Sequence, residues 1–370
     1  MKILYDHQIF SIQHYGGVSR YFYEVAKRLS VEDGCEVEIF APLHINDHLD
    51  TGTGIRVRGK KIRKPPSTGG IIGIINSALT RTLVTTDRSI DVFHETYFTR
   101  ADRCPRSARR LITVYDMIHE KFPRYFPSRD ATRHHKSHAV HRADHVICIS
   151  ENTRRDLIAL LGVPEEKTSV VYLGHSLACP PGAIQPVPVS KPFILYVGSR
   201  AGYKNFDLLL RAFASSRSLQ SDLAIICFGG GKATPAETSL AEALGLPPDR
   251  VIYMNGNDSV LAGLYASARA FVYPSLYEGF GIPPLEAMSF GCPVVCANTG
   301  SLPEVTGDAA LLFDPASESA LRAAMEAVVF CPAHAGRLKE KGLERIRMFS
   351  WEKCAMDTLS VYKNVLGMIR

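Results

Sequence analysis

The sequence has no apolar run long enough to cross a membrane and no recognisable secretory leader. Its longest apolar run, Ile71-Ile72-Gly73-Ile74-Ile75, has five residues, whereas a membrane helix needs about 20. Met1 leads directly into the strand-like stretch Lys2-Ile3-Leu4-Tyr5, without the longer apolar segment of a signal peptide. We therefore expect a cytosolic protein.

Several catalytic and binding motifs are also missing. The chain contains no Walker loop, no Rossmann dinucleotide fingerprint, no nucleophile elbow and no HExxH zinc motif. It has no helix-turn-helix, RNP or zinc-finger pattern, which disfavours a nucleic-acid partner. The nine cysteines include no CxxC pair, and Cys148, Cys227 and Cys296 lie in apolar runs. That pattern indicates buried, reduced thiols.

Positive charge is concentrated in the first half of the chain. Residues 1–178 hold 26 Lys and Arg against 20 Asp and Glu, whereas residues 179–370 hold 17 of each. The excess is gathered in two runs, which are Arg56, Arg58, Lys60, Lys61, Arg63 and Lys64, and then Arg100, Arg103, Arg106, Arg109 and Arg110. Such runs are typical of a surface that meets an anionic partner, and equally of a solvated loop. We expect the first run to contact the acceptor or a membrane.

Alternating apolar runs and amphipathic stretches predict two α/β domains. The chain has 370 residues, and single hydrophobic cores stop growing at about 250–300. We expect strands at 2–5, 36–40, 92–94, 110–115, 145–149 and 169–172 of a first domain (1–178), and at 193–197, 223–228, 250–253, 270–273, 293–296 and 310–313 of a second (193–350). The Pro-rich segment 179–192 indicates a linker. Two doubly wound sheets facing across a cleft would bind a ligand at the carboxyl ends of their strands.

Two acids bracket a glycine-rich turn in Glu278-Gly279-Phe280-Gly281-Ile282-Pro283-Pro284-Leu285-Glu286. The glycines permit positive φ and close approach of the backbone to a ligand, and the prolines suit a first helical turn. The backbone amides at the start of this helix would then face a bound anion. The carboxylates of Glu278 and Glu286 can accept hydrogen bonds from sugar hydroxyls. A plain surface turn with a capping Glu is the alternative.

Two cations precede a helix in the second domain. The strand 193–197 is followed by Gly198-Ser199-Arg200-Ala201-Gly202-Tyr203-Lys204-Asn205 and then by an amphipathic run. Basic side chains oppose the positive end of a helix dipole, so Arg200 and Lys204 are best explained by a bound anion such as a diphosphate. A basic loop without a ligand is the alternative.

The first domain offers fewer candidates. Gly16 and Gly17 again place glycine before a helix. Asp116, at the carboxyl end of the strand 110–115, and His119 are candidates for an acid, a base or a sugar-orienting group, although a structural role suits His119 equally well.

A histidine-rich stretch in the same domain could suggest a metal site. His134, His138 and His141 would share one helical face, but no neighbouring Cys or acid completes a zinc set, so we expect no metal site.

Taken together, these segments resemble the retaining glycosyltransferases of family GT4, which have the GT-B fold of two Rossmann-like domains. The resemblance covers nearly the whole chain. It rests on Gly16-Gly17-Val18-Ser19-Arg20-Tyr21, Val197-Gly198-Ser199-Arg200 with Lys204-Asn205, the two acids of the family's EX7E pattern at Glu278 and Glu286, Gly300-Ser301-Leu302-Pro303-Glu304-Val305 and Phe349-Ser350-Trp351-Glu352.

The resemblance implies a role for each matched residue. Arg200 and Lys204 would bind the diphosphate of a nucleotide-sugar donor, and Glu278 the transferred sugar. The remaining donor-binding residues would be Gly16, Gly17, Ser199, Phe280, Gly281, Leu285 and Glu286, the last at the ribose. In the family, cations and helix dipoles stabilise the leaving diphosphate, so no metal or other cofactor is expected. The helix from Trp351 onward would cross back onto the first domain.

One departure from the family pattern concerns Tyr115-Asp116, where many relatives have His before Asp. His119 would then replace that histidine, or Tyr115 would orient the sugar. In the retaining reaction proposed for the fold, the departing phosphate takes the acceptor proton, so a protein base is not essential. Glu278, Asp116 and His119 are therefore the expected catalytic residues, acting through orientation and charge.

The resemblance implies a metal-independent hexosyltransferase of surface polysaccharide or glycolipid synthesis. It favours mannose, from a donor such as GDP-mannose, and a lipid-linked or saccharide acceptor. The basic first domain would suit peripheral contact with the inner face of an anionic membrane. A nucleotide-sugar 2-epimerase-like isomerase on the same fold and a non-catalytic carbohydrate-binding homologue are the alternatives. The sequence does not identify the base, the sugar, the acceptor or the oligomeric state.

Overall fold

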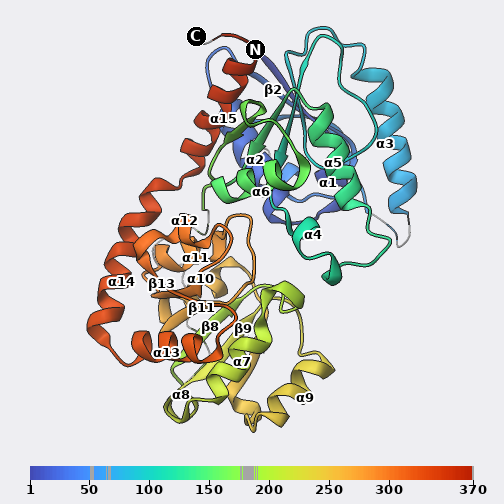
Figure 1. Cartoon of the computed structure of the whole chain (residues 1–370). Coiled ribbons are helices and arrows are strands. Elements are labelled where there is room, and N and C mark those ends of the chain that lie inside the picture. The colour runs from blue at the N-terminus through green and yellow to red at the C-terminus, as the bar shows by residue number, and fades with distance from the viewer. Residues whose placement is uncertain are drawn as a thin grey trace. The chain divides into compact units, whose positions relative to one another are not determined.

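The structure of the chain, a computed structural model, divides into two compact units (Figure 1). The first consists of Met1–Gly174 together with Trp351–Arg370, and the second of His175–Ser350. The structure describes residues 1–50, 54–63, 65, 68–175, 177, 187, 189 and 191–368. Most of the expected linker, 179–192, lies outside the described residues, as does Lys64.

A parallel sheet of seven strands, in the order β3-β2-β1-β4-β5-β6-β7, forms the centre of the first unit. Its strands are β1 (Lys2–Tyr5), β2 (Glu36–His44), β3 (Arg56–Lys61), β4 (Val92–Glu95), β5 (Arg109–Val114), β6 (His145–Cys148) and β7 (Thr168–Val170). The central strands are short, nearly continuous apolar runs because parallel strands are buried on both faces.

Helices connect these strands. They are α1 (Gln8–Ile12), α2 (Gly17–Leu29), α3 (Gly69–Leu83), α4 (Ile118–Lys121), α5 (Thr132–Arg142) and α6 (Glu151–Leu161), with α15 (Trp351–Val365) added from the far end of the sequence. Local signals set several boundaries. At α6, for example, the Ser150 hydroxyl accepts the Thr153 amide at 3.0 Å, and Gly162 ends the helix in a left-handed conformation.

Buried polar contacts fasten α15 to the sheet of the first unit. The Tyr362 hydroxyl lies 2.7 Å from His94 Nδ1 and 3.0 Å from the Tyr5 hydroxyl. On its other side, His94 Nε2 lies 3.0 Å from the Thr113 hydroxyl. All four side chains are fully buried. In Figure 1, α15 runs beside α2. Residues that follow the whole second unit in sequence therefore complete the core of the first.

A parallel sheet of six strands, in the order β10-β9-β8-β11-β12-β13, forms the centre of the second unit. Its strands are β8 (Phe193–Val197), β9 (Ala224–Phe228), β10 (Val251–Met254), β11 (Ala270–Tyr273), β12 (Val294–Ala297) and β13 (Ala310–Phe313). Its helices are α7 (Phe206–Ala214), α8 (Arg217–Asp222), α9 (Pro235–Ala243), α10 (Asp258–Ser267), α11 (Ile282–Ser289), α12 (Leu302–Thr306), α13 (Glu318–Val329) and α14 (Pro332–Arg345).

Two α/β units built on parallel sheets confirm the predicted fold class. Each expected strand is found, and only the ends differ, most at β2, which continues to His44. The thiols of Cys148, Cys227 and Cys296 are buried and free.

One strand, β3, was not predicted, and it contains most of the first basic run. Its strand character was not recognised because charged residues occupy alternate positions. The carboxylates that pair with these charges lie on the neighbouring strand β2. Arg56 lies 3.1 Å from Glu36, Arg58 lies 3.0 Å from the buried Glu38, and β3 pairs with β2 in parallel. The arginines of this edge strand therefore pair with carboxylates of their own sheet.

Lys61, at the end of β3, is paired in the same way. Its Nζ lies 2.7 Å from Asp47 and 2.6 Å from Asp50. Lys60 and Arg63 are the two cations of the run that form no ion pair among the described residues. The run is therefore less positive than its sequence suggests, and neither a plain solvated loop nor a bare cationic patch describes it.

Candidate functional site

Lys204 and Glu278 meet where the strand order of the second sheet reverses. The chain builds β8, β9 and β10 in one direction and then places β11 on the other side of β8. Lys204 follows β8 and Glu278 follows β11, so both lie at the carboxyl ends of neighbouring parallel strands, where such sheets bind ligands. The two side chains form an ion pair with 2.7 Å between Nζ and Oε1.

The surroundings of Lys204 keep its charge fixed. The side chains of Lys204 and Glu278 are 14% and 11% exposed, and Nζ lies 3.3 Å from the Tyr273 hydroxyl. Burial alone would lower the pKa of Lys204, but Tyr273 and Glu278 outweigh it and hold that pKa well above its usual value. A permanent cation in a poorly hydrated setting interacts strongly with any further charge.

Helix α11 begins at a glycine with a left-handed conformation. Gly281, its N-cap, has a φ of 106°, which side chains rarely allow. Pro283 and Pro284 are the second and third residues of the helix and have no N–H. The amide donors of this turn therefore belong to Gly281, Ile282 and Leu285. Together with the helix dipole they favour an anion here.

The turn after Glu278 is held by the segment that follows β12. A Cβ on Gly300 would lie 2.9 Å from the Glu278 carbonyl oxygen, so only glycine fits there. The Ser301 hydroxyl donates to the carbonyls of Glu278 at 2.9 Å and Phe280 at 2.7 Å. These contacts fix the course of the backbone at Glu278, after β11.

Two further expected residues have backbone or side-chain partners within the second unit. Glu286, the fifth residue of α11, is buried and accepts a hydrogen bond from the Tyr265 hydroxyl at 3.4 Å. The Ser199 carbonyl accepts from the Tyr196 hydroxyl at 2.5 Å. Ser199 follows β8 by two residues, and Glu286 lies in the helix that follows Glu278.

Arg200, the second cation expected at the diphosphate, is surrounded by partners from its own unit. Its Nε donates to Glu237 at 2.9 Å. Its two Nη atoms donate to four carbonyl oxygens of the loop Gly229–Lys232, at 2.7–3.3 Å. The side chain is 2% exposed. Arg200 thus holds the glycine-rich loop in place, and its contact with a donor diphosphate stays a prediction.

In the first unit, Gly16 and Gly17 lie at the start of α2, as expected. A Cβ on Gly16 would lie 2.3 Å from Oε1 of Gln13. The same oxygen accepts the Ser19 amide at 3.3 Å. The glycine therefore allows the Gln13 side chain to reach the first turn of the helix, where an anion was expected to approach.

Asp116 lies just after β5, above a buried lysine. Its Oδ1 accepts the Ile118 amide at 3.1 Å and lies 3.6 Å from Lys136 Nζ. Lys136, with a side chain 1% exposed, also donates to the Asp116 carbonyl and to Glu120, at 2.8 Å each. This lysine was missed by sequence reasoning because it stands inside a histidine-rich helix. It fixes the position of Asp116.

His119 contacts the loop that follows α4. Its ring stacks on Phe126 at 3.9 Å between centroids, and its Nε2 lies 3.6 Å from Asp130. Tyr115, at the position where many relatives have the histidine, is buried in the aromatic core, and its hydroxyl donates to the Thr96 carbonyl at 3.4 Å.

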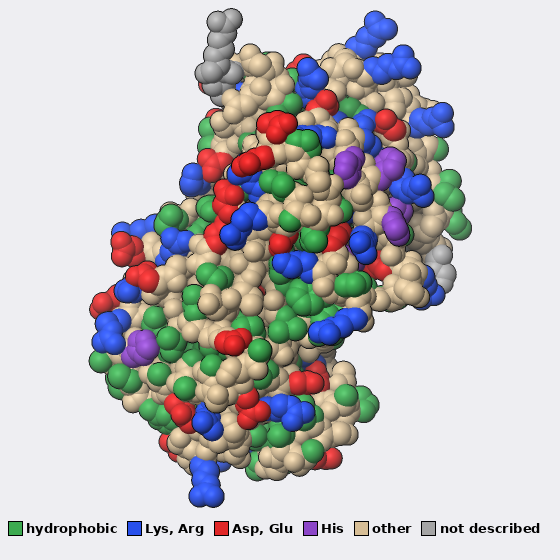
Figure 2. Space-filling view, in the orientation of Figure 1, with side chains coloured by type: hydrophobic (Ala, Val, Ile, Leu, Met, Phe, Trp, Pro, Cys, Tyr) green, Lys and Arg blue, Asp and Glu red, His purple; other side chains and the backbone are tan. Residues whose placement is uncertain are grey.

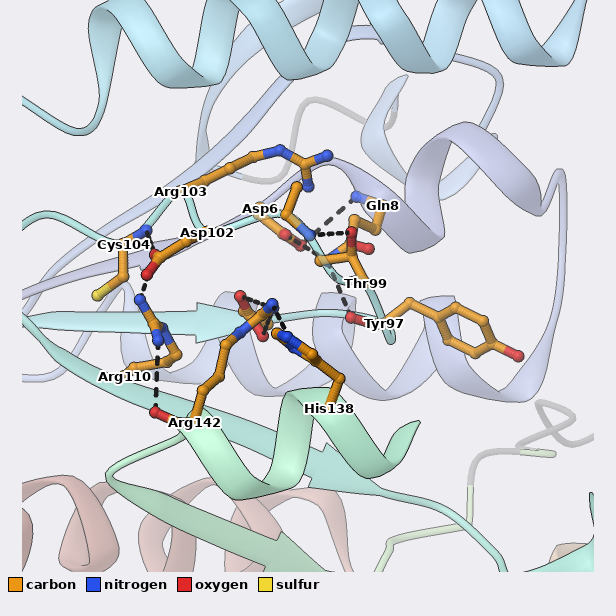
Figure 3. A network of polar contacts seen from close by, with 12 residues as sticks. Asp6, Gln8, Tyr97, Thr99, Asp102, Arg103, Cys104, Arg110, His138 and Arg142 are labelled. Carbon is orange, nitrogen blue, oxygen red and sulfur yellow. Dashed lines mark hydrogen bonds and ion pairs between the residues drawn. The ribbon is translucent and has the colours of Figure 1, made fainter. Parts of the chain in front are cut away.

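The sequence did not reveal a further set of polar residues. They lie between β1 and β4, where the strand order of the first sheet reverses. Asp6 Oδ1 accepts from the Thr96 amide at 2.8 Å and from its hydroxyl at 2.6 Å. Gln8 Nε2 donates to Asp6 Oδ2 at 2.6 Å and to the Tyr97 carbonyl at 2.9 Å (Figure 3). Three polar residues directly after the first strand were the signal that could have revealed this network.

Within the described residues, no group of three or more His, Cys, Asp and Glu side chains is arranged to hold a metal ion. Nor does that part of the chain contain a helix long and apolar enough to span a bilayer.

Comparison with known families decides what this chain is. Residues 15–178 match the family Glycosyltransferase Family 4, and residues 183–345 match Glycosyl transferases group 1. The O-antigen chain mannosyltransferase B of Escherichia coli is 32% identical over 272 residues, covering 70% of this chain and 71% of that protein. The chain belongs to glycosyltransferase family 4.

Four further curated relatives, all named as mannosyltransferases, are matched over only 28–34% of their own length. Lys204, Glu278 and Glu286 lie inside the stretch that matches the group 1 glycosyltransferases, and Gly16 and Asp116 inside the family 4 stretch.

Solved structures support the fold of this glycosyltransferase. Sucrose-phosphate synthase from Thermosynechococcus elongatus has a TM-score of 0.77 at 20% identity, with 100% of each chain covered. The Anabaena protein Alr3699/HepE, solved in complex with UDP, has a TM-score of 0.70 at 19% identity and covers 98% of this chain and 100% of its own. The fold class is GT-B, as the sequence resemblance implied.

Proposed function

We propose that this glycosyltransferase moves a hexose, specifically mannose, from a nucleoside diphosphate sugar such as GDP-mannose to a lipid-linked or saccharide acceptor. Membership of family 4 supports the transfer reaction. The chain is 32% identical to an O-antigen chain mannosyltransferase over 71% of the length of that relative. This similarity supports mannose as the transferred sugar and a role in surface polysaccharide or glycolipid synthesis.

The observation that carries the proposal is the Lys204–Glu278 pair at the reversal point of the second sheet. A cation here can take the charge that develops on a departing diphosphate, while the carboxylate can accept hydrogen bonds from sugar hydroxyls. The amides of Gly281 and Leu285, at the start of α11, add donors for phosphate oxygens. Glu286, the residue after Leu285, would bind the ribose.

The chemistry assigned to this site is retaining transfer. The bond between the anomeric carbon and the diphosphate oxygen breaks, the acceptor oxygen bonds to the same face of that carbon, and the acceptor proton passes to the departing phosphate. The protein then supplies orientation and a fixed positive charge. Asp116, held by Lys136, orients the sugar or the acceptor, whereas His119 and Arg200 are left out of this assignment. Because Lys204 supplies the charge, the reaction needs no divalent metal.

A donor panel scored by thermal shift tests the proposal. A donor at 100 times its dissociation constant should stabilise the protein by about 2.7 kcal/mol, and we expect this response for a mannose donor. GDP-mannose and UDP-glucose should be compared directly, because a structural neighbour was solved with UDP. NMR of the product should show the anomeric configuration of the donor retained. Inversion of the free donor at C2 without acceptor would identify an isomerase instead, and absence of any turnover a binding protein.

We propose in addition that the first unit makes peripheral contact with an anionic membrane on its cytoplasmic side. The support comes from α3, which lies on the outside of this unit in Figure 1 and exposes Ile71 (61%), Ile74 (71%) and Leu83 (49%). Lys60 and Arg63, just before it in the chain, add charge for anionic headgroups.

Liposome flotation tests the membrane contact. The double variant Ile71→Asn/Ile74→Asn and the double variant Lys60→Gln/Arg63→Gln should each reduce recovery with anionic vesicles. Leu160→Asn, on α6 and 46% exposed, is the matched control and should float like the wild type. Unchanged flotation in both double variants would show that this face does not bind lipid.

A further inference from the structure

Helix α5 exposes a row of histidines on its outer face. His134, His138 and His141 are spaced by four and three residues and so share one face of the helix, and His135 adjoins them. The opposite face buries Lys136 and other residues against the unit. The histidines are thus not core residues.

These histidines line a groove of about 870 Å³ together with Arg100 and Arg142. Figure 2 shows histidine side chains gathered at this place on the surface of the first unit, with lysine and arginine side chains around them. Among the described residues that line the groove, none is acidic. Arg100 forms no ion pair with any described residue, so its charge is uncompensated.

Two contacts determine which ring nitrogens carry protons. Arg142 Nη1 lies 3.4 Å from His138 Nδ1, and Figure 3 shows the two side chains side by side on α5. A guanidinium can only donate, so His138 Nδ1 accepts and its proton is on Nε2. His141 Nδ1 lies 2.7 Å from the Ser137 carbonyl and must donate to it. His138 therefore offers an N–H donor even when neutral, and His141 offers a second once it is protonated.

A buried carboxylate controls the charge of Arg142. Its Nη2 lies 2.6 and 2.7 Å from the two oxygens of Glu95, which is 1% exposed. Burial raises the pKa of Glu95 to about 7, against the opposing effect of Arg142 and Arg110 and with a further contribution from Asp6. Burial thus favours the neutral carboxyl, and protonation of Glu95 would leave Arg142 with an uncompensated charge next to the groove.

Neighbouring positive charges oppose the protonation of His135. Burial lowers the pKa of His135, and Arg100, His134 and His138 lower it further, whereas Asp130 opposes the shift. An anion placed among these groups would remove the repulsion, so its binding must be coupled to proton uptake.

We propose that the groove on α5, lined by Arg100, His134, His135, His138 and His141, is a second anion site that binds a phosphoryl group. Its residues belong to the first unit, whereas Lys204 and Glu278 belong to the second, and the proposal does not depend on the proposed transfer reaction. The donors span about 10 Å along the helix, at 1.5 Å per residue over seven residues. A single carboxylate or phosphate would contact only part of this row, whereas a diphosphate can contact more of it. Its occupancy rises as the pH falls toward 6, where histidines charge.

Titration with inorganic pyrophosphate, in the Lys204→Ala background to remove the donor site, tests this. Side-chain ¹H–¹⁵N NMR at pH 6 and pH 8 should show pyrophosphate raising the pKa of the α5 histidines, with binding about tenfold tighter at pH 6. Calorimetry in two buffers of different ionisation heat should show protons taken up on binding.

Matched variants assign the effect to the groove. His134→Gln/His138→Gln and Arg100→Gln should each weaken pyrophosphate binding about tenfold. His334→Gln, on α14 of the second unit, should leave it unchanged. Histidine spectra that do not respond to pyrophosphate, or equal binding in all variants, would overturn the proposal. So would binding of a single-stranded RNA oligonucleotide without any binding of pyrophosphate.

Vesicles distinguish the two sources of a phosphoryl group. If flotation with phosphatidic acid vesicles, but not with phosphatidylcholine vesicles, is lost in His134→Gln/His138→Gln, the group is carried by a lipid. If flotation is unchanged while pyrophosphate binding is lost, the site serves a soluble phosphate compound. Both results support the site and differ only in the origin of its ligand.

Discussion

Lys204 and Glu278 form one ion pair although 74 positions separate them in the chain. Their two strands, β8 and β11, are neighbours in the sheet because the chain reverses its direction of growth there. The pair is nearly buried, so both charges act at close range and with little screening by water. The predictions for catalysis start from this arrangement.

Lys204→Ala should reduce the rate of sugar transfer about 100- to 1000-fold, as loss of one transition-state charge contact typically does. The initial rate with saturating donor is the measurement, and circular dichroism checks that the variant is folded. Lys341→Ala is the control, because that lysine pairs with Asp308 on the surface of the same unit, 2.7 Å away. A rate within tenfold of the wild type would show that Lys204 does not act on the diphosphate.

Treatment with EDTA should leave the rate of transfer unchanged, because we assign the charge of the leaving group to Lys204 and to the amides at α11. The assay compares dialysed enzyme with and without chelator, and then with added magnesium or manganese. Loss of activity that either metal restores would contradict this assignment.

Arg200→Ala should destabilise the second unit, because it leaves Glu237 and the carbonyls of Gly229–Lys232 without their donor. Removing one partner of a buried ion pair typically costs about 3–5 kcal/mol. Denaturant unfolding measures the loss, and Glu237→Gln should show a smaller loss, since Thr234 and the loop remain. If the variant keeps its stability but loses its activity, the result would instead indicate that Arg200 binds the donor diphosphate.

Tyr362→Phe should lower the free energy of unfolding of the first unit by about 1–3 kcal/mol, because it leaves His94 Nδ1 buried without a partner. Tyr5→Phe leaves the contact between Tyr362 and His94 in place and should cost less. Urea unfolding of the full chain measures both. Equal, negligible losses would mean that α15 is held by packing alone.

Acid should destabilise the first unit through His94. Burial lowers the pKa of this histidine to about 3, whereas in the unfolded chain it titrates near 6.5. The unfolded state therefore binds a proton first, and stability is lost as the pH falls below 6.5, by about 1.4 kcal/mol per unit. His94→Gln should reduce this slope, and His14→Gln, 63% exposed at its side chain, should not.

NMR titration checks the same point without any variant. The His94 ring should remain neutral at pH 4.5, where exposed histidines are fully protonated. A His94 ring that titrates near 6.5 in the folded protein would refute the burial argument.

The fold was largely predictable, since strand periodicity and turn residues are local. The unpredicted strand β3 illustrates the limit. Arg56 and Arg58 appear as a cationic run until Glu36 and Glu38 are known to lie on the adjacent strand. Pairing between strands, which is not local, supplies the counter-charges.

The candidate site was predictable only in part. Lys204 and Glu278 follow from the position of each after an apolar strand. Arg200 carries the same local signal, but three of the four carbonyls around it come from successive glycines with φ of 82°, 70° and 80°. Positive φ turns carbonyls in directions that no side-chain pattern reveals. His119 likewise depends on Asp130 and Phe126, which lie in a separate loop.

The place of α15 sets an order of events on the ribosome. A chain emerging from its N-terminus presents β1 and β4 long before Tyr362 exists to satisfy His94. The second unit is contiguous in sequence and can close as soon as it has been made. The domain synthesised first is thus finished last. Until α15 has been made, the side chains of β1 and β4 that it covers remain accessible to chaperones and proteases.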